Sequence, residues 1–209
     1  MWCLMYPIIL HMEGKRCVVA GGGRVAYSKI TALLQAKANI TVISPDVIPE
    51  IERLYSEGNI QLHRKEIEYA DYQDAFLIIA ATNCPEVNRD IYERVKDTKL
   101  VNVVSDSELG NFHIPATLSR GRLQISVATG GASPMLAKAI RDELGDIYDE
   151  SYEEFAEFLY QVRRIIKQSE CSDEKKRELY KEALLDKYRH SIEERKLFIK
   201  KVFTLNPSA

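Results

Sequence analysis

Two glycine-rich turns contain the residues that most clearly suit ligand-binding chemistry. The first, Gly21-Gly22-Gly23-Arg24-Val25-Ala26, follows a short apolar stretch at residues 16–20 and precedes apolar residues at helical spacing. The pattern G-x-G-x-x-A between a strand and a helix is typical of dinucleotide binding. Glycine lets a phosphate approach the backbone, and the helix N-terminus presents N–H donors to it. The alternative is a glycine-rich turn that binds no ligand.

Polar residues after two later strands extend this prediction. In dinucleotide-binding sheets an acidic residue about 20 positions after the glycines binds the ribose. Ser44 stands where that acid often lies, and Pro45 and Asp46 follow it. No arginine nearby would hold a 2′-phosphate, which favours NAD over NADP. Thr82 and Asn83 would also face the cofactor, although Asn83 would equally suit the cap of the next helix.

The second turn, Thr129-Gly130-Gly131-Ala132-Ser133-Pro134, again presents the N-terminus of a helix. Ser133 suits the N-cap and Pro134 the first helical position. Four cations flank this turn in the sequence: Arg120, Arg122, Lys138 and Arg141. Such a cluster of N–H groups and cationic side chains suits a substrate with several carboxylates. The pattern alone is equally consistent with a capped surface helix and solvated charges.

Candidates for acid–base chemistry are few. Asp106, which follows Ser105, and His113 seven positions later would suit proton transfer or weak metal binding. The other interpretation is that both residues stabilise turns. His63 is expected to be structural and His190 solvated. The sequence contains no Ser-His-Asp order, H-E-x-x-H motif or P-loop lysine.

Composition narrows the class of protein. A net charge of −2 over 209 residues gives no indication of nucleic-acid or anionic-membrane binding. No apolar run is long enough to span a bilayer, and a secretory signal is not expected. The four cysteines, Cys3, Cys17, Cys84 and Cys171, form no C-x-x-C pair. We therefore expect a reduced, cytoplasmic protein without disulfides or a thiolate metal site, with Cys17 buried in a strand.

The elements that must position these residues alternate between strand and helix up to about residue 104. Apolar strands are expected at residues 16–20, 39–44, 60–65, 75–80 and 100–104. Helices are expected at residues 25–36, 49–56 and 86–96, with a short turn at 68–72. This alternation predicts an α/β fold with a parallel sheet covered on both faces.

The remainder of the chain follows a different pattern. Extended segments at residues 112–118 and 123–129 are separated by residues 119–122 and followed by a helix from Pro134. The apolar face of that helix is expected to contain Leu136, Ala137, Ile140 and Leu144. Residues 147–203 are predicted to be helical with one break at 169–173, and residues 206–209 to form a frayed end.

Four stretches together resemble the precorrin-2 dehydrogenase family. They read YPIILHMEGKRCVVAGGGRVAYSK, AATNCPEVN, LVNVVSDSELGNFHIPA and ISVATGGASPMLAKAIRDEL, and they span residues 6–144 in order. The resemblance implies a Rossmann NAD-binding domain at residues 1–112, a dimerisation and substrate region at 113–146, and a helical C-terminal domain at 147–209. It also implies assembly as a homodimer.

The resemblance implies a reaction and a set of cofactor contacts. The family oxidises precorrin-2, a tetrapyrrole with eight carboxylates, to sirohydrochlorin with NAD, for sirohaem and in some bacteria cobalamin. That substrate gives Arg120, Arg122, Thr129, Gly130, Gly131, Ser133 and Lys138 a role in substrate binding. The NAD contacts of the family fall here on Gly21, Gly22, Gly23, Arg24, Val25, Pro45, Asp46, Thr82 and Asn83.

One position departs from the family pattern. Similar bifunctional dehydrogenase/ferrochelatases carry Asp where this chain has Ser105. A neutral serine is a poor acceptor for the pyrrole protons released when iron enters, so we expect weak or absent ferrochelatase activity and a separate chelatase. Asp106 and His113 are expected to position groups rather than to act as indispensable bases.

Other functions stay open on the sequence. A bifunctional dehydrogenase/ferrochelatase is one, and a dehydrogenase of another polycarboxylate is a second. A third is an NAD-sensing regulatory domain, as in gating modules of potassium transporters. A nucleotide sensor would not require the second glycine turn with its cations, so that turn distinguishes sensor from enzyme.

Overall fold

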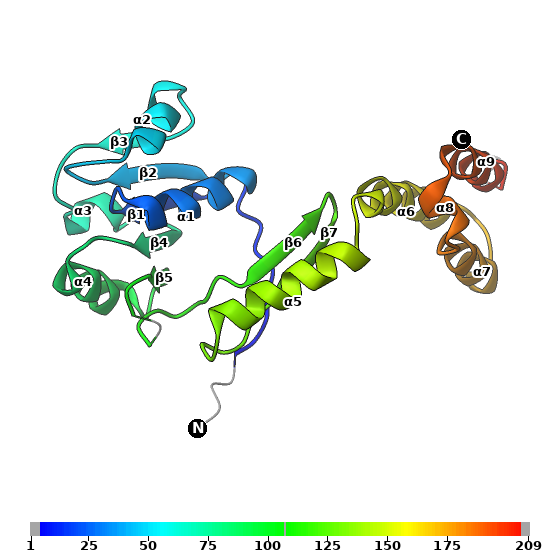
Figure 1. Cartoon of the computed structure of the whole chain (residues 1–209). Coiled ribbons are helices and arrows are strands. Elements are labelled where there is room, and N and C mark those ends of the chain that lie inside the picture. Colours follow the sequence, from blue (N-terminus) through cyan, green and yellow to red (C-terminus); the bar gives the residue numbers. More distant parts are fainter. Residues whose placement is uncertain (1–4, 107, 206–209) are drawn as a thin grey trace. The chain divides into compact units, whose positions relative to one another are not determined.

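The computed structural model describes residues 5–106 and 108–205 and divides the chain into two compact units, Met1–Ile114 and Pro115–Ala209 (Figure 1). The expectations for Cys3 and for the end at residues 206–209 lie outside the described residues. The boundary expected between residues 146 and 147 stays a prediction.

The first unit is built on a five-stranded sheet in the order β3-β2-β1-β4-β5, with every neighbouring pair parallel. Its strands are β1 (Arg16–Ala20), β2 (Asn39–Ile43), β3 (Gln61–His63), β4 (Leu77–Ala80) and β5 (Leu100–Val103). Its helices are α1 (Arg24–Gln35), α2 (Pro49–Ser56), α3 (Tyr69–Tyr72) and α4 (Pro85–Val95). The predicted α/β fold with a parallel sheet is confirmed.

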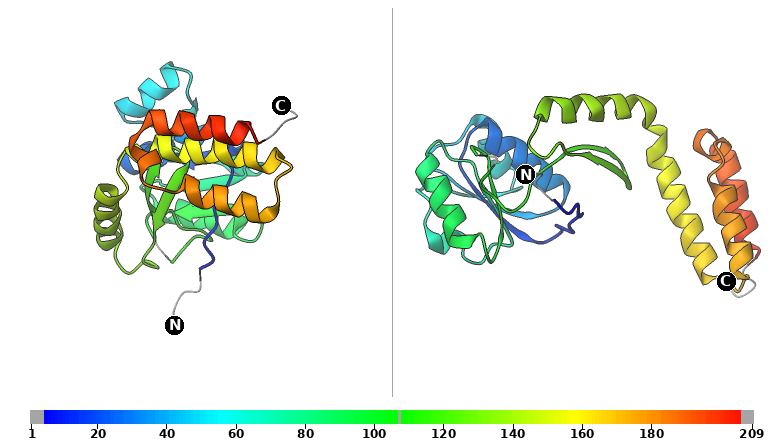
Figure 2. Two further views of the ribbon diagram at one scale, coloured as in Figure 1. Left: turned by 90° about the vertical axis from the view of Figure 1, so that its right-hand side faces the viewer. Right: turned by 90° about the horizontal axis from the view of Figure 1, so that it is seen from below.

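Alternating side chains bury both faces of this sheet. On one face Cys17 and Val19 of β1 pack with Ile30 of α1 and Ile51 of α2. On the other face Val18 and other strand residues pack with Tyr72 of α3 and Ile91 and Val95 of α4. The right-hand view of Figure 2 shows helices on both sides of the strands. Two buried faces explain the four consecutive buried residues in each of β1, β2 and β4.

The second unit begins with an antiparallel hairpin of β6 (Ala116–Arg120) and β7 (Leu123–Val127). Arg120 pairs with Leu123, so the turn consists of Gly121, with φ +57°, and Arg122. The predicted separator of residues 119–122 was therefore two residues too long, because Ser119 and Arg120 continue β6. Helix α5 (Pro134–Ile147) packs on this hairpin, as Figure 1 shows.

The apolar face predicted for α5 is only partly buried. Ala137 is buried, Ile140 and Leu144 are half-buried, and Leu136 is 52% exposed. Met135 beside it is 82% exposed. Helix α5 therefore carries apolar surface that its own unit does not cover.

Four further helices complete the second unit: α6 (Ser151–Gln168), α7 (Asp173–Ala183), α8 (Lys187–His190) and α9 (Ile192–Phe203). Their core is formed by Phe155, Phe158, Val162, Ile166, Leu179, Tyr188, Phe198 and Val202. The predicted break after α6 is present, but a second break around α8 was not predicted. Leu184 and Ile192, which flank this second break, are 62% and 53% exposed.

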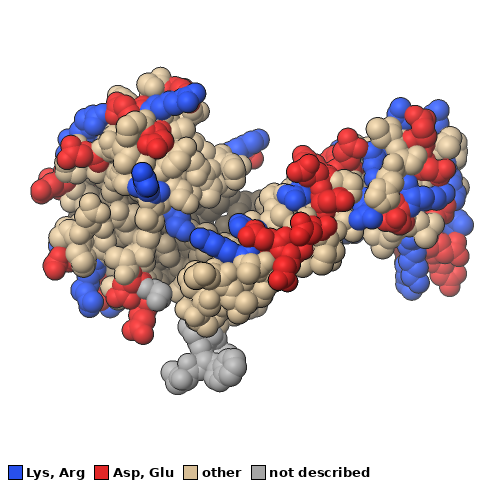
Figure 3. Space-filling model, in the orientation of Figure 1, with Lys and Arg blue, Asp and Glu red and all other residues tan. Residues whose placement is uncertain are grey.

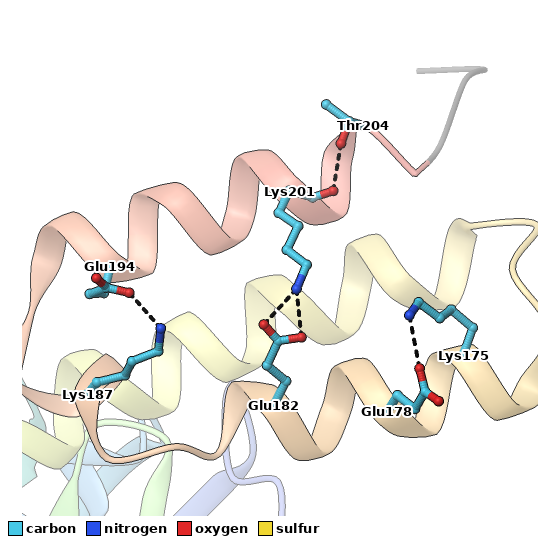
Figure 4. A network of polar contacts seen from close by, with 7 residues as sticks. All are labelled: Lys175, Glu178, Glu182, Lys187, Glu194, Lys201 and Thr204. Atoms are coloured by element: carbon cyan, nitrogen blue, oxygen red, sulfur yellow. Dashed lines mark hydrogen bonds and ion pairs between the residues drawn. The ribbon is translucent and has the colours of Figure 1, made fainter.

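The outer surface of these helices is densely charged, with both signs interspersed over the described part of the bundle (Figure 3). Lys201 of α9 binds Glu182 of α7 at 2.6 Å, and Lys187 of α8 binds Glu194 of α9 at 2.8 Å (Figure 4). These exposed ion pairs add little stability each, so the apolar core must hold the bundle together. No helix in the described ranges is long and apolar enough to cross a bilayer.

Candidate functional site

A cleft of about 720 Å³ opens at the carboxyl ends of the parallel strands in the first unit. Its walls consist of residues 21–23, 43–48, 65–67 and 81–84, together with Val87. The segments follow β1, β2, β3 and β4, which is where ligands bind in doubly wound sheets. A volume of this size lies within the range of roughly 300–1,000 Å³ that is usual for ligand pockets.

The first glycine turn is pressed between two neighbouring loops. Gly21 has φ +119°, and a Cβ there would lie 2.3 Å from the carbonyl oxygen of Ala81. A Cβ on Gly22 would lie 2.1 Å from the carbonyl oxygen of Asp46. A Cβ on Gly23 would meet nothing within 4 Å. The first two glycines are therefore required by packing, whereas Gly23 leaves open space beside the backbone.

Helix α1 begins at this turn with its donors uncovered. Gly23 is the N-cap, so no side chain accepts from the first N–H groups, and the first turn carries no acidic residue. Arg24 and Val25 are exposed, while Ala26 is fully buried against the sheet. An uncapped helix N-terminus beside open space fits the pyrophosphate of a dinucleotide.

The loop after β2 contains the residues predicted to meet the ribose. Ser44 is buried, and its Oγ donates to the carbonyl oxygen of Asp46 at 2.7 Å. Pro45 and Asp46 are exposed and line the cleft. Ser44 thus shapes the loop, and the carboxylate of Asp46 is the acidic group available at this wall.

Sequence reasoning missed Lys65, which also lines the cleft. Its Nζ lies 3.0 Å from Oδ1 of Asp71 and 3.5 Å from Oε2 of Glu68. The hydrogen bond to Asp71 raises the pKa of Lys65. Lys65 follows β3, which is distant from β2 in the sequence. It reaches the cleft because β3 pairs with β2 in the sheet.

The loop after β4 brings Thr82 and Asn83 to the cleft, as predicted. The N-cap of α4 is Cys84, so the alternative interpretation of Asn83 as the helix cap is wrong. Thr82 Oγ1 instead accepts from the backbone N–H of Cys84 at 3.2 Å. Asn88, which sequence reasoning missed, is fully buried and hydrogen-bonds to both Thr82 and Ser105.

The acid–base candidates follow β5. Ser105 is exposed and does not line the cleft. Asp106 Oδ1 accepts from the backbone N–H of Glu108 at 2.9 Å, and His113 is exposed. Asp106 thus stabilises a turn, and no hydrogen bond joins it to His113 in the described structure. Within residues 5–106 and 108–205, no group of three His, Cys, Asp or Glu side chains could hold a metal ion.

The second glycine turn is held by local hydrogen bonds. Thr129 Oγ1 accepts from the N–H of Ser133 at 3.1 Å, and Ser133 Oγ accepts from the N–H of Leu136 at 3.1 Å. This confirms Ser133 as the N-cap of α5. Gly130 and Gly131 have φ of +62° and +84° and are exposed.

The cations predicted around that turn fall into two separate groups. Arg120 Nε donates to the carbonyl oxygen of Tyr148 at 3.1 Å. Arg122 binds Glu157 at 2.5 Å, and its guanidinium lies 3.5 Å from the ring centroid of Tyr160. Both arginines lie at the hairpin turn, and the five residues of β7 separate them from Thr129. At about 3.3 Å per residue that strand keeps the two groups well apart, so the single cluster was a wrong expectation.

Three family models match the chain. A model described as putative NAD(P)-binding matches residues 8–116, and one described as sirohaem biosynthesis protein central matches 120–146. The SirC C-terminal domain model matches residues 152–198. Together they cover both units of the structure.

Two relatives are matched over nearly their whole length. The chain is 38% identical to precorrin-2 dehydrogenase of Priestia megaterium over 95% of this chain and 98% of that protein. It is 39% identical to precorrin-2 dehydrogenase of Bacillus subtilis strain 168 over 77% of this chain and 99% of that protein. The solved structure of "SirC, precorrin-2 dehydrogenase" superposes with a TM-score of 0.82 at 38% identity, covering 96% of this chain and 100% of the other. The chain therefore belongs to the precorrin-2 dehydrogenase family.

Proposed function

We propose that the protein oxidises precorrin-2 to sirohydrochlorin with NAD, in sirohaem and in some organisms cobalamin biosynthesis. The observation that carries this proposal is the match to precorrin-2 dehydrogenases over both units. The cleft supports it, because Gly23 leaves the backbone open to a dinucleotide at the N-terminus of α1.

Each wall of the cleft has a defined task in this reaction. When bound, NAD supplies the hydride acceptor. The N–H groups at Gly22, Gly23, Arg24 and Val25 hold the pyrophosphate, and Gly21 lets that turn pack against the sheet. Pro45 and Asp46 bind the adenosine ribose, which favours NAD over NADP. Thr82 and Asn83 orient the end of NAD opposite the adenosine. The main contribution of the protein to the reaction is therefore to hold the reacting groups in position.

The tetrapyrrole carboxylates require cations and N–H donors. Thr129, Gly130, Gly131 and Ser133 form one group with Lys138, whose side chain is exposed. Arg120 and Arg122 form a second group at the hairpin turn. The charge of Arg122 is already paired with Glu157, whereas Lys138 is exposed to solvent. We therefore assign the larger share of substrate binding to the first group.

Ser105, Asp106 and His113 serve to position groups near the reaction. A serine hydroxyl is a poor proton acceptor, and Asp106 is engaged in a turn. Ferrochelatase activity is accordingly weak or absent, and a separate chelatase consumes sirohydrochlorin.

We also infer a cytoplasmic homodimer. Met135 and Leu136 of α5 are 82% and 52% exposed, and a second copy would cover such apolar surface. This assigns residues 113–146 to dimerisation. A cytoplasmic location suits the exposed thiol of Cys84, which has no disulfide partner among the described residues.

The test is turnover of anaerobically prepared precorrin-2 with NAD⁺, followed by Fe²⁺ or Co²⁺. Absorbance should show NADH and sirohydrochlorin accumulating, with no metal insertion above the uncatalysed rate. Fast metal insertion would establish a bifunctional enzyme. Tight NAD⁺ binding without NADH formation would contradict the proposal and favour an NAD sensor.

A further inference from the structure

Asn88, in the first turns of α4, is a polar side chain with no exposed surface. It lies between the loop after β4, which lines the cleft, and the start of the loop after β5. Burying an amide is costly unless its hydrogen bonds are satisfied, so the position demands an explanation.

Its hydrogen bonds connect these two loops. Oδ1 accepts from the backbone N–H of Thr82 at 3.1 Å and from Thr82 Oγ1 at 2.7 Å. Nδ2 donates to the carbonyl oxygen of Thr82 at 3.0 Å and to Oγ of Ser105 at 3.2 Å. The backbone N–H of Thr82 can only donate, and its carbonyl can only accept. These two contacts therefore determine which end of the Asn88 side chain is Oδ1 and which is Nδ2.

The orientation of the Asn88 amide determines whether the Ser105 hydroxyl donates or accepts in their hydrogen bond. Nδ2 is a donor, so Ser105 Oγ must be the acceptor in this contact. The hydroxyl proton of Ser105 is thereby directed away from Asn88. Since Ser105 is exposed, that proton is available as a donor to a ligand.

We propose that Asn88 is a positioning residue that holds the cofactor-binding loop at Thr82 and sets Ser105 as a hydrogen-bond donor to the substrate. The proposal rests on the function proposed above. One buried amide thus fixes two loops at adjacent strand ends, so that cofactor and substrate groups keep their relative positions during hydride transfer. Asn88 itself does not reach the cleft wall.

The first test is Asn88→Asp, which keeps the acceptor oxygen and removes both donated hydrogen bonds. Its matched control is Asn111→Asp. Asn111 also accepts one backbone N–H, from Val101 at 2.9 Å, and donates to two carbonyls, of Lys96 and Lys99. Those partners lie between the end of α4 and the beginning of β5, and none of them lines the cleft.

NAD⁺ affinity, measured by calorimetry without substrate, separates positioning from simple destabilisation. We expect Asn88→Asp to weaken NAD⁺ binding about fivefold or more, and Asn111→Asp to leave it within about twofold. Urea unfolding midpoints of both variants provide the stability reference. Unchanged NAD⁺ affinity in folded Asn88→Asp protein would overturn the proposal.

A second measurement covers the case in which Asn88→Asp does not fold. Ser105→Ala removes the acceptor of Asn88 Nδ2 without touching the cleft wall, and we expect it to weaken NAD⁺ binding about twofold to threefold. An unchanged affinity would overturn the link between the loops.

Turnover measurements test the second part of the proposal, that Asn88 sets Ser105 as a donor to the substrate. Ser105→Ala should lower kcat in the native protein but have no further effect in Asn88→Asp, because that variant no longer positions the hydroxyl. Additive losses of kcat would overturn the role of Asn88 in setting Ser105. Absence of turnover in the native protein, with the binding shifts present, would refute the proposed function and leave the positioning of the cofactor loop intact.

Discussion

The two glycine-rich turns occupy the same place in a strand–turn–helix sequence but differ in what surrounds them. Gly21 and Gly22 are crowded by the loops at Ala81 and Asp46, which come from other strands of the sheet. A Cβ on Gly131 would meet nothing within 4 Å. The first turn is therefore built into a packed unit, whereas the second is shaped only by its own hydrogen bonds.

This difference separates two kinds of binding site. The first turn has its geometry before any ligand arrives, because tertiary packing holds it from both sides. The second lies on an exposed surface and has no such packing beside Gly131. Preorganisation of the first site favours affinity, and openness of the second suits a large substrate.

The largest effect that would sharpen this comparison is expected for Gly22→Ala. The added Cβ would lie 2.1 Å from a backbone oxygen, so the turn or the loop after β2 must move. We expect NAD⁺ affinity to fall about a hundredfold or more, together with a loss of stability, measured by calorimetry and urea unfolding.

Two other alanine variants serve as controls for that result. Gly23→Ala has room for its Cβ and φ of −90°, so it should retain stability yet weaken NAD⁺ binding by filling the ligand's space. Gly131→Ala should lose some stability because its φ is +84°, with NAD⁺ affinity unchanged. Equal NAD⁺ affinities for the Gly22 and Gly131 variants would break the comparison.

A smaller effect is expected for the cations near the second turn. Lys138→Ala should raise the KM for precorrin-2 about tenfold, because an exposed ammonium is ready to bind a carboxylate. Arg122→Ala should raise it less, since Glu157 and Tyr160 already hold that guanidinium. Steady-state kinetics of both variants will compare their KM values. A larger increase for Arg122→Ala would mean that the arginines at the hairpin turn bind substrate more strongly than the group around Lys138.

Alkylation of cysteines tests the first site without any substitution, and the expected effect is smaller. Cys84 is exposed and lines the cleft, whereas Cys171 lies in the second unit and serves as internal reference. Saturating NAD⁺ should slow the reaction of Cys84 with iodoacetamide severalfold and leave Cys171 unaffected, as followed by peptide mass spectrometry. Equal rates at Cys84 with and without NAD⁺ would place the cofactor elsewhere.

A further effect, on stability rather than on binding, concerns the strand that leads into the first turn. Burial raises the pKa of Cys17 from 9.0 to about 11. The unfolded chain therefore loses this proton at lower pH than the folded protein, so stability is unaffected below pH 9 and falls as pH rises toward 11. The loss amounts to about 2 kcal/mol. Cys17→Ser, which does not titrate there, should show a shallower decline in unfolding free energy, and identical slopes would contradict the assignment.

Local patterns predicted the elements well where residues near in sequence determine them. Residues 16–20 and 49–56 form β1 and α2 with the predicted bounds, since apolar runs and Pro49 mark them directly. The break before α9 also had a local signal that was overlooked. Ser191 caps that helix by accepting from the N–H of Glu194, in the S-x-x-E pattern of a capping box.

The candidate site was only partly predictable, because several of its features depend on tertiary structure. The glycines and Thr82 are found from motifs and strand ends. Asn88 has a partner 17 residues away at Ser105, and Lys65 enters the cleft through the pairing of β3 with β2. No local spacing reveals either contact. The separation of Arg122 from Thr129, in contrast, follows from the length of a strand and was predictable.

The cofactor cleft has one further property, which concerns how freely the rest of the chain can diverge in sequence. All of its walls come from one contiguous stretch, residues 21–87, inside a single unit. Because these walls come from one segment of a single unit, the second unit can diverge in sequence without changing the residues that line the cofactor cleft.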